Sequence, residues 1–136
     1  MTEDEQHLNL LGIFHCIVGG MTALFACFPV VHLALGVAML TGALDGKDAP
    51  PPFMGWMFII FPVLFILGGW ALAACMIVAG RKLQKHTSRM FCLVVAGVEC
   101  IMMPFGTVLG VFTIIVLMRE SVRKLFDTGG EVQAVS

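Results

Sequence analysis

Charged residues are scarce in this chain and absent from most of its length. Of the 136 residues, 12% are charged and 59% are hydrophobic, whereas a soluble domain carries about 25% charged residues. A chain this short has too little interior to hide so much apolar surface from water. The composition therefore excludes an ordinary soluble globular domain and indicates a protein whose solvent is lipid.

Three long segments contain almost no charge. Residues 8–44 and 49–80 lack Asp, Glu, Lys and Arg, and residues 90–118 contain only Glu99. A helix of about 20 apolar residues is long enough to span a bilayer. We therefore predict an all-α integral membrane helical bundle with three to four membrane-crossing helices, built as a single membrane domain over residues 1–126.

Motifs for catalysis, metal binding and nucleic-acid binding are missing as well. The sequence shows no CxxC pair, no phosphate-binding loop, no catalytic nucleophile–base motif, and no basic patch interleaved with aromatic residues. We expect a non-enzymatic protein with no metal, no resident cofactor and no nucleic-acid partner. Its five cysteines are then small buried hydrophobes in reduced form.

One proline lies within the first apolar segment, and a run of three prolines lies at the start of the second. The run Pro50–Pro52 cannot continue a helix, so the second crossing is expected over residues 56–80, with Trp56 at the membrane interface. Residues 8–44 would be about 55 Å long as a helix. This is more than one crossing needs, but it leaves little chain for two crossings and a turn. We expect an amphipathic start at the membrane surface and then a tilted span, with a hairpin at Pro29 as the alternative.

The N-terminus carries a helix-start signal. Thr2 is followed three residues later by Glu5. This spacing is typical of a capping box, in which the two side chains satisfy each other's backbone N–H groups. It predicts that the first helix begins directly after Thr2.

Seven of the eight basic residues lie in two clusters, at residues 81–89 and 119–124. Short cytoplasmic loops collect positive charge, so both clusters and the C-terminus are expected to be cytoplasmic. Residues 90–118 must then cross an even number of times. Each half of this segment would be a helix of about 21 Å, shorter than the bilayer core of about 30 Å. A helical or re-entrant hairpin that turns at 104–106 is favoured, and a single Pro-kinked helix is the alternative.

Glu99 is the sharpest candidate for chemistry, because an ionisable side chain inside a membrane segment costs about 2.5 kcal/mol or more. It is a candidate residue of an ion or proton pathway, with His15 and His32 as candidate partners. In the alternative, the Glu99 carboxyl only joins helices by hydrogen bonds. The two histidines could instead ligate haem or a pigment.

Small residues recur four positions apart in three places. This spacing lets helix backbones approach closely. We predict tight helix packing, within the chain or between copies, at Gly106 and Gly110, at Gly19 and Ala23, and at Gly69 and Ala73.

The C-terminal residues 119–126 have an apolar face surrounded by positive charge. Such a helix lies on an anionic cytoplasmic leaflet, and a helix end with snorkelling charges is the alternative. The expected membrane-surface contacts are Arg119, Arg123, Lys124 and Phe126. Residues 127–136 are predicted to be a disordered tail.

Two stretches resemble a set of small, uncharacterised bacterial multi-pass membrane proteins. Those proteins begin with "HLxLLxIFHxxxGG" and end with "PFGTxLGxxTxxVL" and a charged "VxxLF" tail. The matching residues here are "HLNLLGIFHCIVGG" at 7–20 and residues 104–126. The resemblance covers most of the chain and implies a bacterial membrane protein, but it carries no activity.

Small size, short loops and small-residue faces together favour one functional hypothesis. The chain is expected to be a structural or accessory subunit of a homo- or hetero-oligomeric complex in the bacterial inner membrane, with the lipid bilayer as its surroundings. The alternatives are a small oligomeric ion or proton channel or transporter that uses Glu99, and a haem- or pigment-binding subunit that uses His15 or His32.

Overall fold

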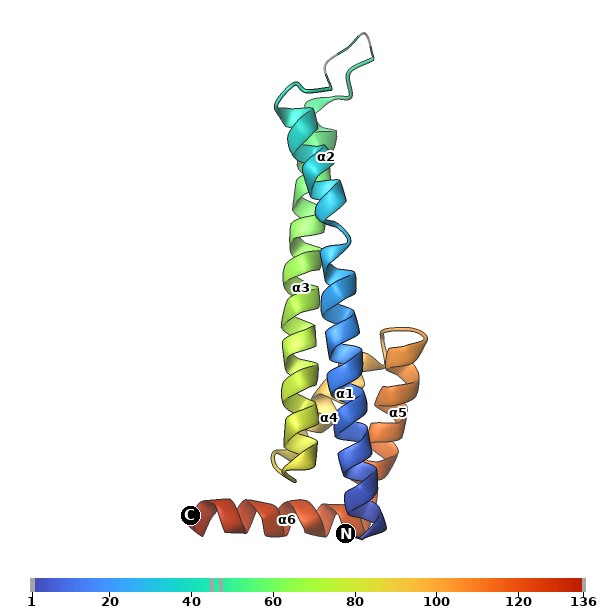
Figure 1. Cartoon of the computed structure of the whole chain (residues 1–136), viewed down its shortest axis with the longest axis vertical. Helices are drawn as coiled ribbons and strands as arrows, with labels where there is room; N and C mark the ends of the chain where they lie inside the picture. The colour runs from blue at the N-terminus through green and yellow to red at the C-terminus, as the bar shows by residue number, and fades with distance from the viewer. Residues whose placement is uncertain (1, 45, 47, 136) are drawn as a thin grey trace. The chain divides into compact units, whose positions relative to one another are not determined.

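The computed structural model describes residues 2–44, 46 and 48–135, with side chains as far as residue 129. The described residues form six helices and no strand (Figure 1), so the all-α prediction is confirmed. The ends of the predicted domain and tail, Met1 and Ser136, lie outside them, as does Lys47. The helices are α1 (Glu3–Cys27), α2 (Val30–Leu40), α3 (Pro52–Gln84), α4 (Arg89–Glu99), α5 (Phe105–Met118) and α6 (Glu120–Val135).

Two helical stretches are long and apolar enough to cross a membrane. One is Glu3–Leu40, which joins α1 and α2, and the other is α3. A third span would require α5 and α6 to act together, although they meet at a bend of 79°. The described residues therefore provide two or three candidate spans, and the upper limit of four crossings is not reached. The alternative hairpin at Pro29 is wrong, because α1 and α2 form one candidate span.

Helix α1 begins where the capping box predicts. The backbone N–H of Thr2 donates to Glu5 Oε2 at 2.9 Å, and the N–H of Glu5 donates to Thr2 Oγ1 at 3.4 Å. The helix then continues without interruption to Cys27. The polar start and the apolar part therefore belong to one helix. No proline precedes Pro29, so nothing forces the helix to end between its polar start and its apolar part.

The helices contribute to two compact units, one of residues 21–72 and the other of residues 1–20 and 73–136. In the unit of residues 21–72, α2 packs against the first part of α3. A Cβ built on Gly36 would lie 2.9 Å from Ile59 and 3.0 Å from the Gly55 carbonyl oxygen. The absence of a side chain at Gly36 therefore permits this close packing.

The unit of residues 1–20 and 73–136 contains the candidate site. Within it the first part of α1 runs antiparallel to the end of α3, because Gly12 lies against Gly80 whereas Gly19 lies against Ala73 and Ile77. A Cβ on Gly80 would lie only 2.6 Å from the carbonyl oxygen of Gly12. The fully buried apolar side chains of this unit include Leu8, Met76, Leu83, Leu117 and Val122.

Helices α4 and α5 form an antiparallel hairpin. The Arg89 Nε–H, at the start of α4, donates to the carbonyl oxygen of Leu117, near the end of α5, at 2.9 Å. Near the turn, Gly110 contacts Ala96, and Gly106 contacts Glu99. The favoured hairpin is therefore present, and the single kinked helix is wrong. Pro104 precedes α5 and lacks a backbone N–H, so it suits the turn better than a helix interior.

Helix α6 extends beyond its amphipathic first turns. Its backbone remains helical from Glu120 to Val135, so the prediction of a disordered tail is wrong for residues 127–135. A tertiary contact accounts for part of this order. A Cβ on Gly129 would lie 2.8 Å from the carbonyl oxygen of His86, in the turn after α3. The polar, glycine-containing sequence gave no sign of that contact.

Candidate functional site

A buried pair of ionisable side chains joins α4 to α1. Glu99 is the last residue of α4, and His15 lies in the middle of α1. Both side chains are completely buried, and the distance from His15 Nε2 to Glu99 Oε2 is 3.1 Å. The structure thus brings together two of the three residues proposed for an ion or proton pathway.

The second ring nitrogen of His15 fixes where its hydrogen lies. His15 Nδ1 is 2.9 Å from the carbonyl oxygen of Leu11. A carbonyl oxygen can only accept, so Nδ1 must carry the hydrogen. Attraction between Nε2 and the Glu99 carboxyl then requires a second hydrogen, held either by the imidazole or by the carboxyl. In both arrangements the pair is neutral overall, which makes its burial tolerable.

The pair does not use all its hydrogen-bonding capacity. The 3.1 Å contact has ion-pair distance but not hydrogen-bond alignment, and Glu99 Oε1 makes no hydrogen bond to any described residue. Buried polar atoms are usually satisfied. The pair therefore differs chemically from the apolar core around it, because one carboxyl oxygen of Glu99 can still take part in a hydrogen bond.

Glycine residues let α3 approach the pair. A Cβ on Gly80 would lie 3.1 Å from the Cβ of His15, as well as 2.6 Å from the Gly12 carbonyl oxygen. On the other side, Cys92 of α4 donates its thiol to the Ala79 carbonyl oxygen at 3.7 Å. Sequence reasoning missed Gly12 and Gly80. The small residues Gly12 and Cys16, four positions apart, were the signal that could have pointed to this packing.

The third candidate, His32, lies in the other unit. It is exposed on α2, and its ring stacks on Phe58 with the centroids 6.1 Å apart and lies 6.5 Å from Phe28. It therefore belongs to an aromatic cluster of residues 21–72 rather than to the pair. His15, for its part, has both ring nitrogens directed at protein oxygens, so neither is free to ligate haem iron or a pigment.

The small residues singled out in the sequence take different positions. Gly106 and Gly110 lie inside the α4–α5 hairpin. Gly19 faces α3, where a Cβ would lie 3.2 Å from the carbonyl oxygen of Ala73. Gly69 packs on Ala26, where a Cβ would lie 2.6 Å from the Ala26 Cβ. Ala23 is half-buried.

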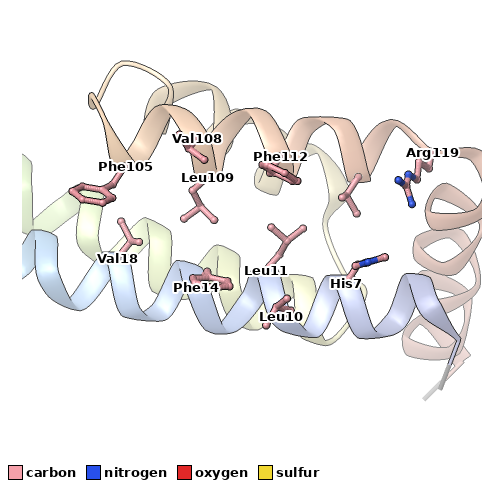
Figure 2. Close-up of a pocket in the computed structure, with 11 residues that line it drawn as sticks. His7, Leu10, Leu11, Phe14, Val18, Phe105, Val108, Leu109, Phe112 and Arg119 are labelled. Carbon is pink, nitrogen blue, oxygen red and sulfur yellow. The ribbon is translucent and has the colours of Figure 1, made fainter.

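An apolar cavity of about 590 Å³ lies between α1 and α5 (Figure 2). Its lining is apolar except at one end, where His7 and Arg119 lie together. Neither His15 nor Glu99 lines it. Sequence reasoning missed this cavity, because only the hairpin fold brings α5 beside α1. Its lining residues are His7, Leu10, Leu11, Phe14, Val18, Phe105, Val108, Leu109, Phe112, Val116 and Arg119.

The prediction that Phe126 contacts the membrane surface is wrong. Phe126 is only 6% exposed and Val122 is fully buried, and the ring of Phe126 meets that of His86 at 6.0 Å in an edge-on arrangement. The apolar face of α6 therefore packs on its own chain and not on lipid. Arg119, Arg123 and Lys124 are exposed.

No protein-family model, curated protein or solved structure matches this chain. The features that bear on function are therefore the buried pair, the cavity and the exposed apolar surface of this chain.

Proposed function

We propose that this chain is a non-enzymatic structural or accessory subunit of an oligomeric membrane complex, formed with itself or with other proteins. The observation that carries this proposal is the length of its exposed apolar helices. The stretch Glu3–Leu40 has 38 residues, which corresponds to about 57 Å of helix.

The bilayer is too thin to cover all of that surface. Its hydrocarbon core is about 30 Å thick, and a helix tilted by about 40°, the upper end of the observed range, crosses it in about 39 Å. The charge-free residues 8–40 of this stretch would still be about 50 Å long, and the α2 part exposes Val31, Leu35 and Val37 to between 44% and 62%. A protein partner would cover the residues that lipid does not reach.

The exposed His32 supports the same proposal. It lies on α2 among those apolar residues. An imidazole that faces lipid is costly, and polar side chains in membrane segments usually face protein or water. A neighbouring subunit would supply a hydrogen-bonding partner as well as apolar cover.

The buried pair supports a structural role too. His15 and Glu99 face each other across the interface of α1 with the hairpin, and they do not line the cavity. Polar contacts of this kind hold membrane helices together. The pair would fix the hairpin against α1 and so present a single surface to a partner.

A cytoplasmic C-terminus in a bacterial inner membrane forms part of the proposal. The contacts of His86 with Phe126 and Gly129 bring the two positively charged stretches to one end of their unit. The positive-inside rule assigns such an end to the cytoplasm. The resemblance to bacterial multi-pass proteins supports the bacterial origin.

Site-specific photo-crosslinking in membranes tests the proposal. A benzophenone amino acid at Leu35 on α2 should yield a crosslink to a second copy or to another protein, which mass spectrometry identifies. The same probe at the exposed Lys124 on α6 is the matched control. The proposal is refuted if probes at Val31, Leu35 and Val37 all fail to crosslink and the purified protein is strictly monomeric.

A second candidate function is a small proton or ion channel or transporter. It is favoured by one observation, the buried His15–Glu99 pair with an unused oxygen on Glu99. Proton flux into liposomes should then fall strongly for Glu99→Gln, because the amide cannot exchange the proton. Equal flux for wild type and Glu99→Gln would exclude the channel.

A further inference from the structure

We propose that the cavity between α1 and α5 binds one acyl chain of an anionic phospholipid, with the phosphate held at Arg119 beside His7. This site is separate from the buried pair and from the α2 surface. It goes beyond the proposed subunit role, because it assigns a lipid ligand to a defined cavity.

The shape of the cavity suits an acyl chain. Its volume of about 590 Å³ lies within the range of about 300–1,000 Å³ for ligand pockets. On α1 it extends from His7 to Val18, which is about 16 Å along the helix. The cavity is thus elongated along the helix axis, as a single hydrocarbon chain requires.

The lining provides the apolar contacts that such a chain needs. Figure 2 shows Phe14, Leu11, Phe112 and Leu109 facing one another from the two helices, with Phe105 and Val18 at the end far from Arg119. Nothing in this part of the lining can pair with a polar ligand. The chain of an amphiphile would lie here, with its polar group at the other end.

The other end carries the charge that a phosphate requires. Arg119 is 52% exposed, and its Nη1 lies 3.7 Å from Asp4 Oδ1. A guanidinium has five N–H donors in a fork that matches phosphate geometry, so this single long contact leaves donors free. His7 lies opposite Arg119 at the same end and offers a ring N–H. The Asp4 carboxylate would compete with the phosphate for Arg119.

The sequence places this end at the level of the lipid headgroups. His7 directly precedes the charge-free residues 8–44, and Arg119 directly follows residues 90–118. Both therefore mark the boundary where apolar chain gives way to polar chain. A phospholipid in the same leaflet has its phosphate at this boundary and its acyl chain beyond it. An anionic headgroup is favoured over a zwitterionic one, since it brings no positive charge of its own to Arg119.

Native mass spectrometry of the full-length protein in detergent tests the assignment. The probes are phosphatidylglycerol and phosphatidylcholine, added in equal amounts. The wild type should retain phosphatidylglycerol preferentially. Arg119→Gln should weaken that binding about five-fold, as expected for one arginine near an anionic headgroup. The matched control Arg81→Gln, which removes an exposed cation of α3 outside the cavity, should leave it unchanged.

Two further variants separate binding from misfolding. Asp4→Asn removes the competing carboxylate and should strengthen phosphatidylglycerol binding, a gain that a damaged fold cannot produce. Val108→Trp fills the cavity and should abolish retention, whereas Val111→Trp, on an exposed position of α5 outside the lining, should not. Equal retention of the two lipids by the wild type would overturn the proposal. So would an Arg119→Gln variant that binds like the wild type, or an Asp4→Asn variant that binds less.

Discussion

Replacing only one partner of the His15–Glu99 pair should lower the free energy of unfolding more than replacing both residues. In His15→Leu, the carboxyl of Glu99 stays fully buried and loses the only polar atom that the described residues bring within ion-pair distance. In Glu99→Leu, His15 loses its partner at Nε2 but keeps its contact with the Leu11 carbonyl. In the double variant, two apolar side chains meet and no polar atom of the pair is left alone.

The burial of both side chains determines how much unfolding free energy each substitution should remove. A buried polar group left without a partner costs about 1–3 kcal/mol, and more if it is charged. Breaking a buried pair costs up to about 3–5 kcal/mol, whereas replacing both partners by apolar residues is often neutral. We expect about 2 kcal/mol for His15→Leu, the middle of the range for a buried polar group without a partner, and less than about 1 kcal/mol for the double variant. Ordinary interhelical hydrogen bonds in membranes contribute about 0.6 kcal/mol.

The measurement is reversible unfolding in mixed micelles with increasing dodecyl sulfate, followed by far-ultraviolet circular dichroism. The two single variants and the double variant form a double-mutant cycle. Thr113→Val is the matched control, because Thr113 is buried but its hydroxyl bonds to Leu109 in its own helix at 2.7 Å. It should change the unfolding free energy by less than about 1 kcal/mol. A coupling energy below about 0.5 kcal/mol would refute the reasoning.

Two further predictions concern packing. Gly110→Val should destabilise the hairpin by about 3 kcal/mol or more, because a Cβ there would lie 2.5 Å from the Ala96 carbonyl oxygen. Gly97→Ala is the control. A Cβ on Gly97 would have no neighbouring atom within 4 Å, so this change should be neutral or slightly stabilising. The same unfolding assay checks both, and equal effects would contradict the packing. Phe126→Ala should lower hydrogen-exchange protection of α6 by about 3 kcal/mol, because Phe126 is buried. Lys124→Ala should not, and unchanged protection in Phe126→Ala would show that the ring does not anchor the helix.

Pro104 and Gly106 show how far sequence reasoning reached within the hairpin. A proline and a small residue so close together, between two halves too short to cross alone, made a reversal the favoured interpretation. The contacts of Arg89 with Leu117 and of Gly110 with Ala96 show that reversal. The sequence could not show which neighbour the hairpin would meet, because apolar helices carry little information about their partners.

For residues 119–126, the sequence pattern indicates the helix but not what covers its apolar face. Their amphipathic pattern correctly indicates a helix with one apolar face, but it is equally consistent with burial in lipid and burial in protein. The contact of Phe126 with His86 decides for protein. The glycine-containing segment after it looks unstructured in isolation, and only its contact at Gly129 shows a structural reason for it to stay helical.

The sequence by itself determined that this protein is all-α and that its long helices are apolar enough to cross a membrane. Long charge-free segments leave no alternative to apolar helices, and the capping box and proline positions set where helices begin and break. The tertiary structure alone decided that Glu99 meets His15 and not His32, that Phe126 faces inward, and that an apolar cavity opens between α1 and α5. Each of these depends on which faces of distant helices come together, and helical periodicity describes only one helix at a time.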